Sequence, residues 1–217
     1  MAGMAATGRS LDAVSGLLRL SGGRRLRSPM GTATRPTTAR VREAVMNMLA
    51  PQLQDASWLD LCSGSGVMGC EALQRGASCV VAVDQDPQCI RVSRSNLSAV
   101  AASRSPAPEI RTERRELIAW LRKGWSHDPF DIVYFDPPYD QGLYEPCFSA
   151  LAQGNWLHQE SLVVCEHRSN QNPGPGSGWS VIDQRRYGIS SVLLLSPPER
   201  CHHGGTDSKP PRTDPSE

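Results

Sequence analysis

The sequence predicts one α/β domain built on a mostly parallel sheet that ends in an antiparallel hairpin. From residue 57 onward, short β-branched apolar segments alternate with helix-like segments, which is the pattern of a parallel sheet covered on both faces. After Glu166 no long helix is predicted, and residues 179–186 and 189–195 form two strand-like segments instead. A dinucleotide-binding sheet would continue with a second set of βαβ units. A chain of 217 residues with 39% hydrophobic content suffices for one well-buried domain.

Proline and glycine mark the boundaries of the predicted helices. Pro87 occupies a first-turn position, where proline is tolerated because the missing N–H has no partner inside a helix. Gly76 and Gly124 follow helix-like segments as C-terminal stops. The predicted strands are residues 58–62, 79–84, 109–113, 130–136 and 162–166, and the predicted helices are the segment ending at Arg75 and residues 87–100, 116–123 and 143–152.

The segment before this domain is predicted to hold a small hairpin and one helix. Residues 17–30 are strand-like and are broken by a Gly-Gly pair. Thr38 is a predicted N-cap, because apolar residues recur after it at helical spacing. Arg40 and Arg42 fall off the apolar stripe, so we expect both to be available to a partner. The residues of the stripe, expected to face the core, are Val41, Ala44, Val45, Met48 and Leu49.

Positive charge is concentrated at the N-terminal end. The net charge is +1, but residues 1–42 carry eight arginines and one aspartate, which leaves a net charge of −6 on residues 43–217. Clustered arginine suits contacts with phosphates. A solvated basic tail without a partner is the alternative. The predicted division is a flexible extension (1–16), a basic arm and helix (17–52), the α/β domain (53–196) and a disordered tail (197–217).

Cysteine usage and hydropathy exclude several classes of protein. The seven cysteines are an odd number without C-x-x-C spacing, which favours a reducing compartment over a disulfide framework or a zinc site. The Cys-His-His run at residues 201–203 lies in the Gly/Pro/Ser-rich tail, where a solvated end is favoured over a metal site. No apolar stretch approaches the length of a membrane span, and no signal-peptide core is present. We expect a cytoplasmic monomer with no metal and no membrane contact, although residues 1–16 leave organelle import open.

A glycine motif follows the first predicted strand of the domain. Gly64, Gly66 and Gly69 match the pattern G-x-G-x-x-G, and Asp84 ends the next predicted strand. Glycines let the backbone approach a ligand closely, and a carboxylate at that strand end can accept hydrogen bonds from both ribose hydroxyls of an adenosine. The pattern alone suits NAD and S-adenosylmethionine equally. A strand-to-helix turn without a ligand is the structural alternative.

Asp60 favours S-adenosylmethionine. A carboxylate at this place would face a pyrophosphate unfavourably, but it would complement the ammonium of a methionine tail. Glu116, after the third strand, is a further candidate at the same edge. It could contact the adenine amine, or it could be a first-turn helix acid stabilised by the helix dipole. The predicted cofactor-binding residues are Asp60, Gly64, Gly66, Asp84 and Glu116.

The D-P-P-Y sequence indicates which group accepts the methyl group. It consists of Asp136, Pro137, Pro138 and Tyr139 and ends the predicted strand 130–136. An exocyclic amine of a nucleobase is a poor nucleophile, because its lone pair is conjugated with the ring. The Asp136 carboxylate and the Pro137 carbonyl can accept both N–H hydrogens and so direct the lone pair towards a methyl group. Tyr139 offers a face on which a flipped-out base can stack. A proline turn that only ends a strand is the alternative interpretation.

Three segments together resemble the bacterial RsmD-type methyltransferases, which modify the N2 amine of a guanine in small-subunit ribosomal RNA. They are the glycine motif, the D-P-P-Y sequence and the sequence R-P-T-T-A-R-V-R-E-A-V-M-N-M-L at residues 35–49. The resemblance runs from about residue 17 to residue 195. It implies a Rossmann-like class I methyltransferase fold that uses S-adenosylmethionine, with ribosomal RNA or the small ribosomal subunit as partner. It also implies that residues 136–139 hold the guanine. The predicted RNA-binding residues are Arg25, Arg35, Thr37, Thr38 and Arg40.

Three other functions are less well supported by the sequence. A DNA adenine-N6 methyltransferase is disfavoured because no separate target-recognition domain is visible in the 217 residues. A non-catalytic RNA-binding factor for ribosome assembly is disfavoured by the presence of Asp60, Asp84 and Asp136. An oxidoreductase is the weakest alternative, because neither the terminal hairpin nor the diproline loop has a role in one.

Overall fold

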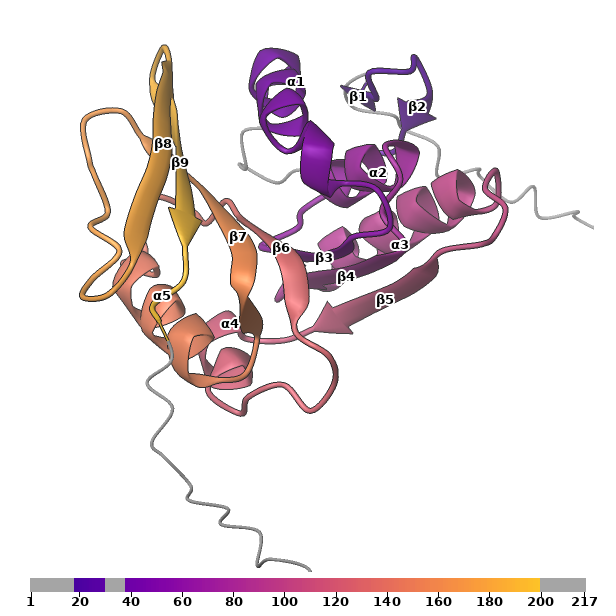
Figure 1. Ribbon diagram of the computed structural model, residues 1–217. Coiled ribbons are helices and arrows are strands. Elements are labelled where there is room, and N and C mark those ends of the chain that lie inside the picture. The colour runs from indigo at the N-terminus through magenta and orange to yellow at the C-terminus, as the bar shows by residue number, and fades with distance from the viewer. Residues whose placement is uncertain (1–17, 30–37, 200–217) are drawn as a thin grey trace, which may run out of the picture.

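A computed structural model describes residues 18–29 and 38–199 of the chain. Within these ranges a seven-stranded sheet carries helices on both faces (Figure 1). The predicted extension 1–16, most of the predicted tail, and Arg35 and Thr37 lie outside them. No helix in the described part of the chain is long and apolar enough to cross a membrane.

The sheet has the strand order β5-β4-β3-β6-β7-β9-β8. Neighbouring strands from β5 to β7 are parallel, whereas β9 runs antiparallel to both β7 and β8. The prediction of a parallel sheet closed by a hairpin is therefore confirmed. The strands are β3 (Ser57–Leu61), β4 (Cys79–Asp84), β5 (Glu109–Arg114), β6 (Phe130–Phe135), β7 (Leu157–Arg168), β8 (Ser180–Tyr187) and β9 (Ser190–Ser196).

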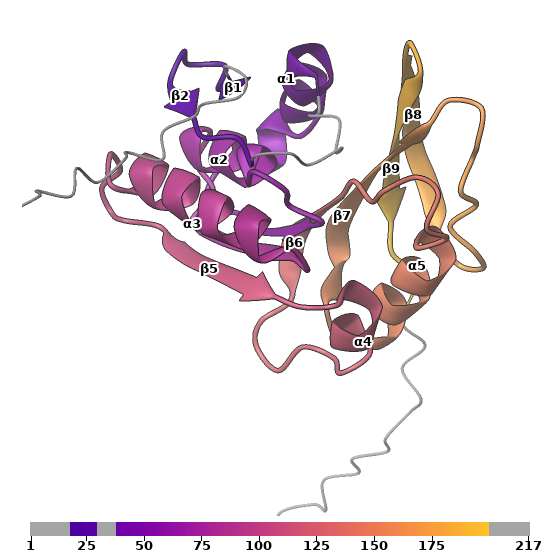
Figure 2. The same ribbon diagram turned by 180° about the vertical axis from the view of Figure 1, so that it is seen from behind.

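Helices cover the sheet in two layers. Figures 1 and 2 show three of them, α1 (Ala39–Met48), α2 (Val67–Gln74) and α3 (Pro87–Ala101), on one side of the sheet, with α4 (Leu117–Leu121) and α5 (Tyr144–Gln153) on the other. Each layer has its own core. Along β3, the alternation of a strand sends Trp58 into the first core and Leu59 into the second, and both are fully buried.

Helix caps follow the sequence signals. Asp86 caps α3 by accepting hydrogen bonds from the backbone N–H of Gln88 at 2.6 Å and of Cys89 at 3.4 Å, with Pro87 in the first turn. Thr38 caps α1, since its Oγ1 accepts from the N–H of Val41 at 3.3 Å. The predicted N-terminal hairpin is also present, as the antiparallel strands β1 (Leu18–Arg19) and β2 (Arg25–Leu26).

The β7 strand is longer than predicted. The predicted segment 162–166 is only part of the twelve-residue strand Leu157–Arg168. The register against β6 shifts between Phe130 and Ile132, and the residues of β7 between Leu157 and Leu162 form the irregularity. Because the residues in this irregularity are mostly polar, they interrupt the apolar pattern on which the strand prediction depended.

The prediction that Arg42 is available to a partner is wrong. Only 5% of Arg42 is exposed, and its guanidinium lies 3.6 Å from the carboxylate of Glu71 on α2. Its Nη2 also donates to the carbonyl of Arg19 at 2.6 Å. The helical stripe is displaced accordingly, so that Met46 is fully buried while Ala44 and Met48 are only partly buried. The cause is tertiary: α2 and the β1–β2 hairpin pack where a partner-facing side was expected.

Candidate active site

The candidate site lies at the point where the sheet reverses its direction of winding. From β3 the chain adds β4 and β5 on one side, and then returns to add β6 and β7 on the other. In open α/β sheets, ligands bind outside the carboxyl ends of the strands at such a switch point. Both sequence motifs follow strands that border it, because the glycine motif follows β3 and the D-P-P-Y sequence follows β6.

The register places four functional positions at one level. Leu61 pairs with Val83 on β4 and with Phe135 on β6, and Phe135 pairs with Cys165 on β7. The next residues along these four strands are Cys62, Asp84, Asp136 and Glu166. Three of these four side chains are carboxylates, so a row of acceptor oxygens runs across the carboxyl edge of the sheet.

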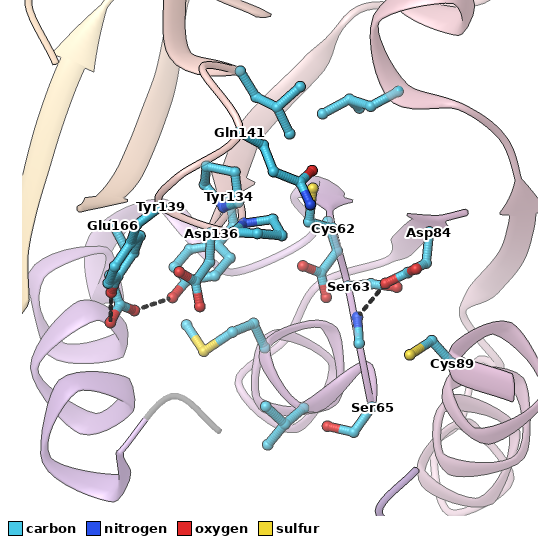
Figure 3. A pocket seen from close by; sticks show the side chains of 18 of the residues that line it. Cys62, Ser63, Ser65, Asp84, Cys89, Tyr134, Asp136, Tyr139, Gln141 and Glu166 are labelled. Carbon is cyan, nitrogen blue, oxygen red and sulfur yellow. Dashed lines mark hydrogen bonds between the residues drawn. The ribbon is translucent and has the colours of Figure 1, made fainter. Parts of the chain in front are cut away.

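A cavity of about 1280 Å³ opens over this row. Figure 3 shows Asp136 between Glu166 on one side and the loop of Cys62 and Ser63 on the other. The lining extends from the glycine loop to Thr38 at the start of α1 and to the tip of the β8–β9 hairpin. The cavity therefore has a glycine-loop end and a D-P-P-Y end, which we call the cofactor end and the acceptor end.

At the cofactor end, the backbone orients the Asp84 carboxylate. Its Oδ2 accepts from the N–H of Gly64 at 2.9 Å, and its Oδ1 accepts from the N–H of Asp86 at 2.9 Å. Gly64 and Gly66 have left-handed backbone conformations, with φ of 52° and 72°. The loop thus wraps around the Asp84 carboxylate and holds it at the cavity wall.

Asp60 lies almost completely buried at the same end, with 1% exposure. Burial raises the pKa of its carboxyl to about 8, a hydrogen bond from the Gly69 N–H opposes this rise, and the negative charge of Asp84 adds to it. The distance from the Gly69 nitrogen to Oδ2 of Asp60 is 3.2 Å. A cation bound beside Asp60 would reverse the shift, because it favours the charged carboxylate.

The cofactor end has the room and the polar groups that a nucleoside with a charged tail requires. A Cβ added at Gly64 would meet no heavy atom within 4 Å, so the loop leaves open space there. The buried hydroxyl of Ser63 lines the cavity and has no hydrogen-bond partner in the described structure. A buried hydroxyl of this kind is costly unless a partner binds to it. These features fit S-adenosylmethionine, and the individual contacts to it stay predictions.

Glu116 lines the cavity as the N-cap of α4. Its two carboxylate oxygens accept from the N–H of Ile118 at 3.2 Å and of Ala119 at 2.7 Å. Glu116 is thus the N-cap residue, one position before the first-turn acid that the sequence offered as the alternative. A contact to the adenine amine stays a prediction.

At the acceptor end, the buried Glu166 carboxylate joins two tyrosines. The Tyr134 hydroxyl donates to Oε2 of Glu166 at 2.9 Å, and the Tyr139 hydroxyl donates to Oε1 at 3.4 Å (Figure 3). The Tyr139 hydroxyl also lies 3.2 Å from Oγ of Ser190 on β9. Burial raises the pKa of Tyr139 above its ordinary value, so its hydroxyl stays protonated and available as a donor.

Arg168 covers the Tyr139 ring. The Arg168 Cζ lies 5.6 Å from the ring centroid, and its Nη2 donates to Oδ2 of Asp140 at 3.3 Å. Pro137 is buried, whereas Pro138 is exposed. The D-P-P-Y turn is therefore fixed from both ends, by the buried proline that follows β6 and by the contacts of the tyrosine.

The structure brings only part of the predicted RNA-binding set to the cavity. Thr38 lines its edge, whereas Arg25 on β2 and Arg40 on α1 are exposed and do not line it. In Figure 1, β2 and α1 lie above strands β3 to β6, towards the end of the molecule at which the tip of the β8–β9 hairpin lies. The RNA-binding role of the set stays a prediction.

Sequence reasoning assigned no role to Glu166, Arg168 or Ser190. Glu166 carried a usable signal, because a charged residue at the end of an apolar strand was predicted for the same edge as Asp136. Ser190 carried none, since its contact with Tyr139 joins residues 51 positions apart. Such a contact depends on the position of β9 in the sheet.

Comparison with known proteins decides the family. Residues 13–196 match the model of the family described as Conserved hypothetical protein 95. The chain belongs to this family. It is 35% identical over 185 residues to Ribosomal RNA small subunit methyltransferase D of Escherichia coli strain K12, covering 83% of this chain and 90% of that protein. It is 30% identical over 181 residues to the protein of the same name from Haemophilus influenzae, covering 83% and 91%.

Solved structures agree with this membership of the Conserved hypothetical protein 95 family. Escherichia coli yhhF superimposes with a TM-score of 0.72 at 31% identity, covering 85% of this chain and all of that chain. A more distant likeness, to the magnesium protoporphyrin IX methyltransferase of Synechocystis PCC 6803, has a TM-score of 0.57 at 15% identity and shows the shared fold alone. The predicted RsmD-type resemblance and class I methyltransferase fold are thereby confirmed.

Proposed function

We propose that this protein methylates the exocyclic N2 amine of a guanine in small-subunit ribosomal RNA, with S-adenosylmethionine as methyl donor. One observation carries the proposal: the D-P-P-Y turn and the glycine loop lie beside each other at one switch point and line one cavity. The relatives named Ribosomal RNA small subunit methyltransferase D support the choice of RNA.

The cofactor end suits S-adenosylmethionine, which supplies an electrophilic methyl group when bound. On this proposal Asp84 accepts hydrogen bonds from the ribose hydroxyls, which its fixed position beside Gly64 supports, and Gly64 and Gly66 let the backbone come close to the nucleoside. Asp60 would balance the positive charge of the methionine tail. Glu116 is proposed as a further contact, in addition to its capping of α4.

At the acceptor end, the protein has to hold an amine and remove a proton. The Asp136 carboxylate and the Pro137 carbonyl accept the two N–H hydrogens of the amine, and the Tyr139 ring stacks on the base. The nitrogen lone pair then points towards the methyl group. Bound S-adenosylmethionine would supply the methyl group, so that the N–C bond would form as the S–C bond of the donor breaks, and Asp136 would be the first acceptor of the N–H proton that leaves. Pro137 and Pro138 keep the turn rigid, because their φ angles are fixed.

The RNA surface is proposed to lie on the N-terminal side of the cavity. Arg40 is exposed on α1, whose N-cap Thr38 lines the cavity, and Arg25 is exposed on β2, which is followed by the lining residues Ser28 and Pro29. With Arg35, they would neutralise phosphates next to the flipped guanine, and Thr37 and Thr38 would donate hydrogen bonds to phosphate oxygens. On this proposal the basic arm and helix, residues 17–52, are the RNA-facing part, and residues 53–196 carry the cofactor and the chemistry.

The deciding experiment compares ribosomal RNA from cells with and without this protein. Digestion to nucleosides and mass spectrometry should show loss of N2-methylguanosine from the small-subunit RNA when the protein is absent. Wild-type protein should restore the modification, and so should Asp128→Ala, which changes an exposed aspartate in the loop before β6. Asp136→Ala should restore none of it while binding S-adenosylmethionine normally. Loss of a methylated adenine, or full restoration by Asp136→Ala, would refute the proposal.

A further inference from the structure

The Glu166 carboxylate is a buried charge that the proposed amine chemistry does not use. Glu166 is only 3% exposed, yet it lines the acceptor end of the cavity. It comes one residue after Cys165, which pairs with Phe135, just as Asp136 comes one residue after Phe135. Adjacent strands lie about 4.8 Å apart. A second carboxylate is thus held one strand away from the carboxylate proposed to bind the amine.

Two tyrosine hydroxyls keep this carboxylate in one place. Tyr134 donates to one of its oxygens at 2.9 Å and Tyr139 to the other at 3.4 Å. A carboxylate offers about four acceptor positions, so it can accept hydrogen bonds from several donors at once. Tyr134 is itself fixed, since its ring stacks on Trp58 with the centroids 6.0 Å apart. The position of Glu166 is therefore set by the core of the protein.

A carboxylate at this position can distinguish guanine from adenine. On the Watson–Crick edge of guanine, the N2 amine lies beside the N1–H donor. On adenine, the N6 amine lies beside a bare N1 lone pair. A carboxylate next to the amine site accepts a hydrogen bond from the N1–H of guanine and repels the N1 lone pair of adenine.

We infer that Glu166 is the specificity-determining residue for guanine, and that its carboxylate accepts the N1–H of the flipped base. This inference rests on the proposed guanine-N2 function. It gives that function a physical reason within the protein, because the D-P-P-Y turn alone accepts any exocyclic amine.

The test uses a base that has the same amine but lacks the N1–H. The methylated guanine is first mapped in a small-subunit ribosomal RNA transcript with the wild-type protein. Synthetic RNAs then carry either guanine or 2-aminopurine at that position, and kcat/KM is measured for each. 2-Aminopurine keeps the N2 amine and has a lone pair at N1. Wild-type protein should prefer guanine by about 10- to 100-fold, the range for a hydrogen bond to a charged group.

Glu166→Gln should remove most of this preference, because the amide can donate an N–H to the N1 lone pair of 2-aminopurine. Glu166→Asp keeps the charge, so it should retain the preference even where turnover falls. The ratio of the two substrates cancels any general loss of activity. Glu160→Gln is the matched control, since it makes the same change at an exposed position of the same strand and should leave the ratio unchanged.

Ser190→Ala separates recognition of the base from support of the Tyr139 ring. It removes the other partner of the Tyr139 hydroxyl and leaves Glu166 in place, so the preference for guanine should survive. If the wild-type protein methylates guanine and Glu166→Gln keeps the wild-type ratio, the inference fails while the proposed function stands. If the wild-type protein methylates no guanine amine, both fail.

Discussion

The Nε atom of Arg42 lies 3.6 Å from Oε1 of Glu71, and both side chains are almost fully buried. The same Oε1 accepts hydrogen bonds from the N–H and the hydroxyl of Ser21, at 2.9 and 3.1 Å. One carboxylate on α2 therefore joins α1 to the loop of the β1–β2 hairpin. This arrangement attaches the N-terminal segment, which carries the proposed RNA-binding residues, to the domain that carries the chemistry.

Arg42→Ala should destabilise the protein strongly, since it leaves the Glu71 charge buried without its cation. The expected decrease in the free energy of unfolding is about 3–5 kcal/mol. Urea denaturation followed by circular dichroism measures it. Arg40→Ala, at an exposed position of the same helix, should change stability by about 0.5 kcal/mol at most. An unchanged urea midpoint for Arg42→Ala would show that the pair contributes no net stability.

The pKa of Asp60 predicts that cofactor binding depends on pH. With a pKa of about 8, the carboxyl is mostly protonated at pH 7, and a bound ammonium favours the charged form. Binding should therefore release a proton. The affinity for S-adenosylmethionine should rise with pH up to about 8. Calorimetry in buffers of different ionisation enthalpy measures the proton release, and equal heats in all buffers at pH 7 would contradict the prediction.

The raised pKa of Asp60 also predicts that the stability of the ligand-free protein falls with rising pH, whereas the affinity for the cofactor rises. The folded state holds a proton on Asp60 that the unfolded state has released, so stability should fall as pH rises from about 4 to about 8. Asp60→Asn removes the ionisable group and should abolish this part of the pH dependence. It should raise the melting temperature at pH 8 by several degrees, since each kcal/mol added to the free energy of unfolding raises it by about 2–4 °C. The same substitution should weaken cofactor binding. A melting temperature at pH 8 that stays at the wild-type value would count against a buried charge at Asp60.

Two alanine substitutions in the glycine loop should separate stability from cofactor binding. A Cβ at Gly66 would lie 2.8 Å from the Cβ of Ser93, so Gly66→Ala should lower the melting temperature markedly. A Cβ at Gly64 meets nothing within 4 Å, so the backbone conformation is its main cost, about 1–2 kcal/mol. Gly64→Ala should nevertheless reduce the affinity for S-adenosylmethionine, because the methyl group enters the cavity. Normal affinity in Gly64→Ala would place the cofactor elsewhere.

Charge reversal at Arg25 and Arg40 tests the RNA surface. The double change to glutamate should weaken binding of a ribosomal RNA fragment. It should also reduce the salt dependence of the binding constant, by about one ion for each phosphate that the protein no longer neutralises. Filter binding over a range of salt concentrations measures both effects. Arg122→Glu is the control, as an exposed arginine at the far end of α4. Equal effects of the control and the double variant would indicate non-specific attraction.

Local signals in the sequence were sufficient for most of the fold. The order of elements follows from apolar runs and from helix-start signals, as for Thr38 at the start of α1 and Pro87 at the start of α3. The residues on either side of the switch point were predictable as well, because parallel strands bring their carboxyl ends to one edge. For this reason the same cavity is lined by Asp60, Asp84 and Asp136.

The sequence failed where a partner from a distant segment decides the outcome. Arg42 was expected to face solvent, because nothing in α1 indicates that Glu71 lies against it. The role of Glu166 depends on two tyrosine hydroxyls, of which the Tyr134 group comes from a neighbouring strand 32 residues earlier. Pairings of this kind follow from three-dimensional packing and leave no periodic pattern in the chain.

The place of Ser190 has a consequence for the growing chain. It lies on β9, which the ribosome makes after β8 but which enters the sheet between β7 and β8. The loop that holds Asp84 is complete once residue 86 has been made, whereas Tyr139 receives its hydrogen-bond partner on β9 only with residue 190. A chain that stops before the final strand contains every residue of the Asp84 loop but lacks the hydrogen-bond partner of Tyr139 on β9. The proposed acceptor end is therefore completed only when the last strand enters the sheet, because Ser190 is part of its lining.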